Sequence, residues 1–150
     1  MAVPCRTWWR PFAAPGQATS LLAVDASFVV DVCLSQAGFA PLDPEELVAP
    51  PLLLSEATSA IHELRWRGVV ADEVAEMGLE RLLAGAVATR RPAQLWRTAW
   101  RVADELGWAK TYDAEYVAIA LLLRVPLVTV DARLRRGASS MVEVLGPTEL

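Results

Sequence analysis

Two aspartates come directly after short apolar runs in this chain of 150 residues. Asp25 follows the run 21–24, and Asp131 follows the run 126–130. Both runs are typical of short buried strands, and open parallel sheets place their chemistry at the carboxyl ends of their strands. We therefore expect the two carboxylates to lie at one edge of a sheet.

Two further acidic residues, Glu56 and Asp113, fall on the apolar faces of expected helices. Residues three or four apart share a helix face, and such neighbours include Leu53 and Ala60 for Glu56, and Val117 for Asp113. Carboxylates are rarely placed against a core unless something compensates their charge. A hard divalent cation is the simplest compensator for four such groups.

Four carboxylates gathered at one place raise each other's pKa unless a cation lies between them. Ligands that are all oxygen suit Mg²⁺ or Mn²⁺ rather than zinc. A metal held in this way lowers the pKa of a bound water and neutralises charge that develops on a phosphate. The residues thus predict metal-assisted phosphodiester hydrolysis with water as the nucleophile. The alternative is that the acids cap helices or pair with arginines such as Arg65, Arg67 and Arg124.

Strands and helices are expected to alternate along the chain, which predicts an α/β fold with a mainly parallel sheet of about four or five strands between two layers of helices. The expected strands are 21–24, 86–89, 127–130 and 142–145. The expected helices are 27–36 with Ser27 as N-cap, one turn at 45–48, then 52–67, 72–83, 93–106 and 112–124, followed by a short basic segment at 133–136. We expect a single domain over 21–150, preceded by an irregular arm rich in proline and tryptophan at 1–20.

Composition places the chain among compact globular proteins, because 54% of its residues are hydrophobic. The net charge of −4 argues against a broadly basic nucleic-acid-binding surface but permits a local basic patch. The two cysteines, Cys5 and Cys33, lack the spacing of a disulfide framework or a zinc site. Residues 1–20 lack the apolar segment of a secretory signal, and no apolar run is long enough to span a bilayer. We expect a cytoplasmic protein without a membrane partner.

The acidic segments together resemble a known family. In chain order they are Asp-Ala-Ser at 25–27, Ser-Glu at 55–56, the Tyr-Asp-Ala segment at 112–118 and Thr-Val-Asp at 129–131. This order resembles that of PIN-domain ribonucleases, in particular the VapC-type toxins of bacterial toxin–antitoxin pairs. The resemblance covers most of the chain, from about residue 21 to 145, and no member of the acidic quartet of the family is missing.

The resemblance implies a PIN-like, Rossmann-like sandwich and a Mg²⁺- or Mn²⁺-dependent endoribonuclease. It implies that Asp25, Glu56, Asp113 and Asp131 hold the metal and orient the attacking water, and that Thr129 forms hydrogen bonds within the site, as Ser27 would in the same way. It also implies an RNA substrate, a cognate antitoxin that neutralises the toxin, and a homodimer or a higher toxin–antitoxin assembly. The arm before residue 21 departs from the family pattern, in which the first strand begins almost at the N-terminus.

Three arginines, Arg133, Arg135 and Arg136, follow Asp131 closely and are candidates for holding substrate phosphates. The alternative is a solvated basic turn. Trp96 and Trp100 lie one helical turn apart, and we expect core or dimer packing for them rather than stacking on bases. His62 is expected at the surface, and Glu115 is expected to face away from Asp113 because about 200° of helix separates the two.

Other functions are compatible with the same residues. The chain would also suit a PIN-domain nuclease of RNA processing, or a non-catalytic PIN-fold binding protein that has lost its metal. A receiver-like phospho-acceptor domain also gathers aspartates around magnesium, but it needs a lysine at a late strand end. Lys110, the only lysine, precedes an expected helix instead.

Overall fold

The computed structural model describes residues 19–150, so most of the arm expected at 1–20 lies outside the described residues. The elements follow in the order β1 (Leu21–Val24), α1 (Ala26–Leu34), η2 (Ala40–Leu42), β2 (Glu46–Ala49), α2 (Leu52–Trp66), α3 (Asp72–Leu83), β3 (Val87–Thr89), α4 (Leu95–Leu106), α5 (Tyr112–Leu123), β4 (Leu127–Val128), α6 (Ala132–Ala138), β5 (Val144–Leu145) and η3 (Pro147–Glu149).

The strands form one five-stranded sheet in the order β3-β2-β1-β4-β5, and every neighbouring pair is parallel. β1 is central and pairs with β2 on one side and with β4 on the other, where Val24 lies opposite Val128. The chain therefore adds β2 and then β3 on one side of β1, and later crosses back to add β4 and β5 on the other side. Parallel sheets of this kind bind ligands where the direction of winding reverses, which here is the gap after the ends of β1 and β4.

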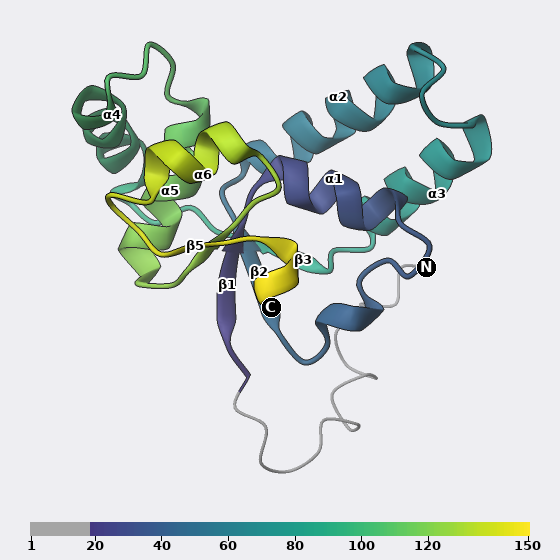
Figure 1. Cartoon of the computed structure of the whole chain (residues 1–150), viewed down its shortest axis with the longest axis horizontal. Coiled ribbons are helices and arrows are strands. Elements are labelled where there is room, and N and C mark those ends of the chain that lie inside the picture. The colour runs from purple at the N-terminus through teal and green to yellow at the C-terminus, as the bar shows by residue number, and fades with distance from the viewer. Residues whose placement is uncertain (1–18) are drawn as a thin grey trace.

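Helices cover both faces of the sheet (Figure 1). On one side α1, α2 and α3 contact one another, while on the other side α4 lies against α5, and α5 contacts β1 and β4. Each helix or group of helices connects one strand to the next parallel strand, which is the usual way to join parallel strands. The result is a sheet between two groups of helices, with the carboxyl ends of the strands directed toward the space between them.

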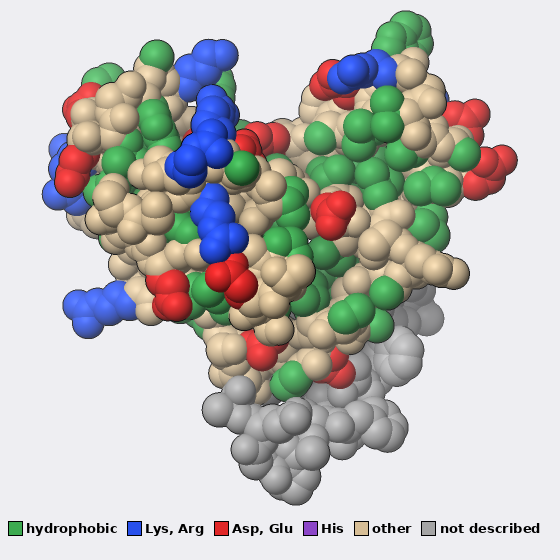
Figure 2. All heavy atoms as spheres, viewed as in Figure 1, with side chains coloured by type: hydrophobic (Ala, Val, Ile, Leu, Met, Phe, Trp, Pro, Cys, Tyr) green, Lys and Arg blue, Asp and Glu red, His purple; other side chains and the backbone are tan. Residues whose placement is uncertain are grey.

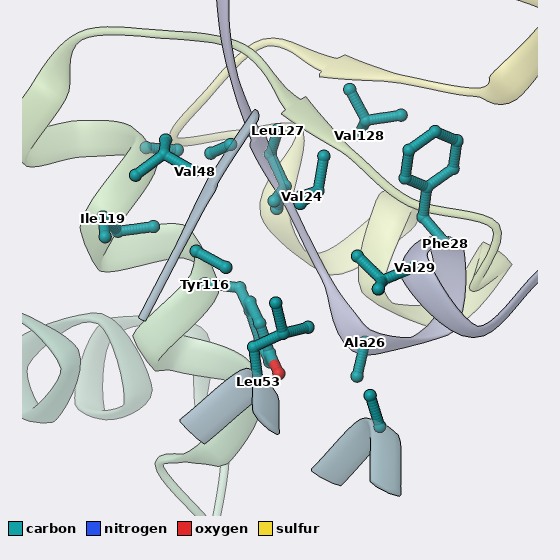
Figure 3. Close-up of a cluster of buried hydrophobic side chains, with 14 of the residues drawn as sticks. Val24, Ala26, Phe28, Val29, Val48, Leu53, Tyr116, Ile119, Leu127 and Val128 are labelled. Atoms are coloured by element: carbon teal, nitrogen blue, oxygen red, sulfur yellow. The ribbon is translucent and has the colours of Figure 1, made fainter. Parts of the chain in front are cut away.

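The core is made of apolar side chains from the strands and from the helices on both faces. Figure 3 shows part of it, with strand residues such as Val24 and Leu127 between Phe28 of α1 and Ile119 of α5. All four are buried. Because both faces of the sheet are covered, its strands are apolar on both sides, as is usual in parallel sheets.

Helices α1 and α3 approach each other closely at Gly78. A Cβ atom added at Gly78 would lie 2.7 Å from Cδ2 of Leu34, so a larger residue here would require the Leu34 side chain to move. The Arg81 guanidinium, one turn further along α3, donates a hydrogen bond of 3.0 Å to the carbonyl oxygen of Cys33. This bond satisfies one of the carbonyl groups that the end of α1 leaves without a helical partner.

The α/β class, the parallel sheet and its flanking helices agree with the sequence analysis, and most element boundaries agree within two residues. One expectation was wrong: the segment at 45–48 is not a helical turn but forms β2, which pairs with β1. Another was wrong in detail, since Asp25 and not Ser27 is the N-cap of α1. Among residues 19–150, no helix is both long enough and apolar enough to cross a membrane.

We expect Leu127→Ala to lower the free energy of unfolding by about 2–5 kcal/mol, because Leu127 is fully buried in the central sheet and its truncation leaves a cavity. Leu83→Ala is the matched control, since Leu83 is 63% exposed and its loss should change the value by less than about 0.5 kcal/mol. Urea unfolding followed by circular dichroism measures both. Equal effects would contradict the assignment of Leu127 to the core.

Candidate functional site

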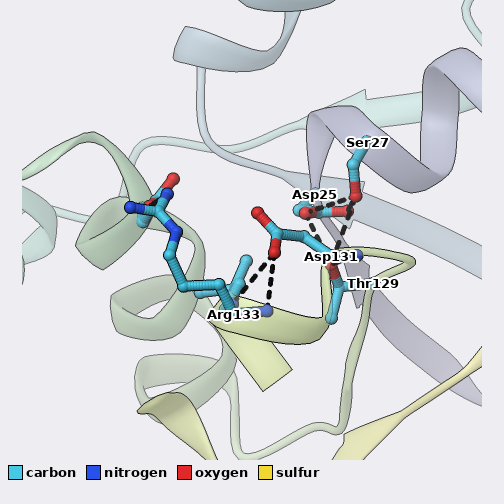
Figure 4. Close-up of polar contacts among 7 residues, drawn as sticks. Asp25, Ser27, Thr129, Asp131 and Arg133 are labelled. Atoms are coloured by element: carbon cyan, nitrogen blue, oxygen red, sulfur yellow. Dashed lines mark hydrogen bonds and ion pairs between the residues drawn. The ribbon is translucent and has the colours of Figure 1, made fainter. Parts of the chain in front are cut away.

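Asp25 lies at the junction between β1 and α1, and its side chain is almost completely buried. Its carboxylate accepts hydrogen bonds from the Phe28 backbone N–H at 3.0 Å, from Ser27 Oγ at 2.8 and 2.9 Å and from Thr129 Oγ1 at 2.7 Å. The bond to Phe28 is the N-cap of α1. Figure 4 shows these groups around the carboxylate. Both oxygen atoms are thus fixed by donors from the first turn of α1 and from Thr129, which follows β4.

Asp131 approaches Asp25 from the other strand end. Its Oδ1 atom caps α6 by accepting the backbone N–H groups of Arg133 at 2.7 Å and Leu134 at 3.2 Å. Its own backbone N–H donates to Thr129 Oγ1 at 3.0 Å, and the same hydroxyl donates to Asp25. Thr129 therefore ties the two aspartates together, and Figure 4 shows their carboxylates beside each other.

Burial raises the pKa of Asp25 above its ordinary value, and this is the largest influence on it. The hydrogen bonds from Phe28, Thr129 and Ser27 lower the pKa in part, while the negative charge of Asp131 raises it further. The ionised carboxylate is therefore well hydrogen-bonded but poorly compensated in charge. Within the described part of the chain, neither aspartate forms an ion pair with a basic side chain.

Glu56 of α2 meets Tyr116 of α5 across the space above the sheet. The Tyr116 hydroxyl donates to Glu56 Oε2 at 2.6 Å, and the tyrosine ring is buried in the core. Burial, the hydrogen bond to Glu56 and the charges of Glu56, Asp25 and Glu115 all raise the pKa of Tyr116, so the phenol stays protonated. The sequence analysis gave Tyr116 no role, because nothing local in the sequence reveals that its hydroxyl positions one of the four acids.

Asp113, in the first turn of α5, is paired with an arginine. Its Oδ2 atom lies 2.9 Å from Nη2 of Arg133, whose side chain is largely exposed. This pairing is the alternative that the sequence left open, although the partner is Arg133 rather than Arg65, Arg67 or Arg124. Arg133 was expected to hold substrate phosphates, but here it forms an ion pair with Asp113, one of the predicted metal ligands.

The structure brings the four acids together in part. Asp25 and Asp131 lie beside each other, whereas Glu56 is bonded to Tyr116 and Asp113 to Arg133. Among residues 19–150, no three acidic, histidine or cysteine side chains form a group that could by itself hold a metal ion. A site in which all four acids surround one ion therefore stays a prediction.

Asp25 and Asp131 nevertheless fit a magnesium or manganese ion. Both offer carboxylate oxygens, and their mutual repulsion is relieved by a cation. Mg²⁺ is commonly held by one or two carboxylates, with water and substrate phosphate oxygens completing its coordination. A pair of aspartates is thus a sufficient protein contribution for such an ion.

Glu115 was expected to face away from Asp113, and the contacts of the two residues agree with this, since Glu115 meets Trp96 of α4 whereas Asp113 is paired with Arg133 of α6. Burial raises the pKa of Glu115, a hydrogen bond from the Trp96 side chain lowers it in part, and the charge of Glu56 raises it. Glu115 thus lies between α4 and the acidic residues. Trp96 itself was expected in the core or a dimer contact, but 55% of its surface is exposed in this chain.

The remaining candidates are exposed side chains of α6 and α2. Figure 2 shows a notch between the group of helices that includes α2 and the group that includes α4, α5 and α6, with basic side chains along one side. Of the arginines on α6, Arg135 forms an ion pair with Glu149 at 2.7 Å, and Arg136 makes no ion pair with any described residue. His62 is exposed on α2, as expected.

We expect Asp25→Asn to stabilise the metal-free protein at neutral pH, because asparagine keeps a hydrogen-bond acceptor and removes the buried charge. Folding raises the pKa of Asp25. The contribution of this group to the free energy of unfolding is therefore largest below its unfolded pKa of 3.8, and it is lost as the pH rises through the folded pKa. The advantage of Asp25→Asn should therefore be largest at neutral pH and should shrink toward pH 3.8. Urea unfolding in EDTA across this range measures it.

Asp31→Asn is the control for this experiment, because Asp31 is an exposed acid on the same helix. It should unfold like the unsubstituted protein at every pH. An Asp25→Asn variant that is less stable than the unsubstituted protein at pH 7 would show that the hydrogen bonds outweigh the buried charge.

Comparison with known proteins supports the fold but does not identify a family. No family model matches the chain, and no curated protein matches it. The structure is similar to the crystal structure of PAE2754 from Pyrobaculum aerophilum, with a TM-score of 0.64 and 26% sequence identity over 85% of this chain and 92% of that one. The likeness spans nearly the whole of both chains and supports a Rossmann-like sandwich of a parallel sheet between helices.

Proposed function

We propose that the chain is a PIN-domain endoribonuclease that depends on Mg²⁺ or Mn²⁺ and acts as the VapC-type toxin of a toxin–antitoxin pair. One observation carries the proposal. The carboxylates of Asp25 and Asp131 lie together where the winding of the sheet reverses, and their charge is not compensated by the described part of the chain. The RNA substrate and the toxin role come from the family resemblance of the acidic segments.

The side chains around the aspartates have separate tasks in this proposal. Ser27 and Thr129 hold the Asp25 carboxylate in one orientation, and Thr129 also fixes the backbone of Asp131. Tyr116 holds Glu56 with its side chain directed to the same space, where Glu56 can accept a proton from water. A bound metal ion would lower the pKa of the attacking water and neutralise charge on the phosphate.

The substrate would enter through the notch above the strand ends (Figure 2). Arg136 is free to meet a phosphate there, and Arg133 becomes free once its pairing with Asp113 is released. Arg135 is less available because Glu149 holds it. The proposal also includes a cognate antitoxin and a homodimer or higher assembly, both of which come from the family resemblance.

A second candidate is a non-catalytic protein with the same fold. The pairing of Asp113 with Arg133 favours this candidate, because it takes one of the four predicted metal ligands. In that case Arg133 would stay paired with Asp113, which could then not serve as a metal ligand. The two candidates differ in whether divalent ions bind and whether RNA is cleaved.

We expect Asp25→Asn and Asp131→Asn each to lower the rate of RNA cleavage at least about a hundredfold, because each removes a negative charge that would hold the metal. Cleavage of total cellular RNA in magnesium, with the fragment ends mapped, measures this and identifies the target. Asp31→Asn should cleave normally, since Asp31 is exposed on the outer side of α1. Cleavage that persists in EDTA would overturn the mechanism, and toxicity on expression that these same substitutions relieve would test the toxin role.

We expect Arg133→Ala to tighten magnesium binding by up to about fivefold, because the substitution removes a cation that competes for Asp113 and an exposed ion pair contributes at most about 1 kcal/mol. The measurement is the rise in unfolding temperature as magnesium is added. Arg135→Ala is the matched control, since it breaks an exposed pair with Glu149 on the same helix. If magnesium stabilises none of the three proteins, the non-catalytic candidate is favoured.

A further inference from the structure

Trp96, in the first turn of α4, is a large aromatic side chain that is both exposed and fixed in place. More than half of its surface is accessible. Its indole N–H, the only donor of the side chain, is held by Glu115. The Arg91 guanidinium carbon lies 5.3 Å from the centre of its ring, which is within the range of a cation–π contact.

This ring is next to the candidate active site. Glu115, which holds the indole, lies in the first turn of α5 between Asp113 and Tyr116. Asp113 is one of the four acids, and the Tyr116 hydroxyl is bonded to another, Glu56. Because α4 packs along α5, Trp96 lies beside the first turn of α5, where it meets Glu115.

The surface around Trp96 is basic although the chain as a whole carries a net charge of −4. The exposed arginines before and on α4 are Arg90, Arg91, Arg97 and Arg101. An aromatic ring among arginines is the arrangement with which proteins bind single-stranded nucleic acids, since rings stack on bases and guanidinium groups meet phosphates or stack in turn. Trp100, one turn along α4 from Trp96, is 65% exposed and adds a second ring. Arg97 and Arg101 alternate with these two rings, which favours RNA over a partner helix, because a partner helix would meet mainly apolar side chains.

We propose that Trp96 and Arg91 form a stacking subsite for one unpaired base of the RNA, next to the scissile phosphate. The inference rests on the proposed function for the identity of the ligand. The base stacks on the face of the indole opposite the Arg91 guanidinium, which lies over the ring, while the indole N–H meets Glu115. The subsite thus places the RNA backbone over Asp25 and Asp131 without reading the identity of the base.

Binding of a short unstructured RNA tests this subsite separately from cleavage. The probe is a fluorescein-labelled oligonucleotide, and a second probe has the same backbone and charge but lacks the bases. Both are titrated in magnesium with protein carrying Asp25→Asn, which prevents cleavage. Ionic strength is held constant because phosphate contacts make binding depend on salt.

Trp96→Ala should weaken binding of the intact RNA roughly 5- to 150-fold, as expected for the loss of one stacked base. It should leave binding of the base-free probe unchanged. Trp66→Ala is the matched control, because Trp66 is 82% exposed at the far end of α2, ten residues beyond Glu56. This control should bind both probes like the parent protein.

Equal binding by the Trp96→Ala and Trp66→Ala proteins would overturn the subsite. So would an equal loss for both probes, since the effect would then not come from base stacking. A change in oligomeric state on Trp96→Ala, seen by sedimentation, would overturn it in favour of a protein interface. If the Asp25-intact protein cleaves no RNA while Trp96→Ala still weakens binding of intact RNA alone, the nuclease proposal fails and the subsite stands.

Discussion

The arrangement at the carboxyl edge of the sheet depends on one constraint, the burial of the Asp25 carboxylate between two parallel strands. A buried charge is costly unless it is hydrogen-bonded and compensated. The chain supplies the hydrogen bonds in full, from a backbone amide and two hydroxyl groups. It does not supply the compensating charge within the described residues, and Asp131 adds a second negative charge nearby. A fold that keeps such a pair gives up stability at this point, which is typical of functional sites.

Much of the fold follows from the sequence because the strands β1 and β4 are short apolar runs that each end in an acid. Their pairing places Asp25 and Asp131 at one edge, and this requires only that the strands be parallel neighbours. The strand β2 could not be recognised in the same way. Its apolar stretch is only three residues long and lies between Glu46 and two prolines, so local signals for turns dominated, and the strand is defined by its pairing with β1.

The sequence predicts where the four acidic residues lie along the strands and helices better than it predicts which side chains they contact. Helix periodicity gives the direction in which Glu115 and Asp113 point relative to each other. It does not reveal that α5 lies between α4 and the sheet, so that both sides of its first turn meet other elements. For the same reason, the pairing of Asp113 with Arg133 depends on how α6 is placed, and the bond from Tyr116 to Glu56 depends on how α2 faces α5.

The capping role of Asp131 restricts how it can serve as a ligand. Its Oδ1 atom is engaged by two backbone amides of α6, so a cation that drew on both carboxylate oxygens would have to unravel the start of that helix. Only Oδ2 remains available for coordination. Single-oxygen ligation suits the compact octahedral shell of magnesium, whereas calcium commonly takes bidentate carboxylates and a larger, more irregular shell. If Asp131 binds a metal ion as proposed, its role as the cap of α6 would favour a small ion such as magnesium over calcium.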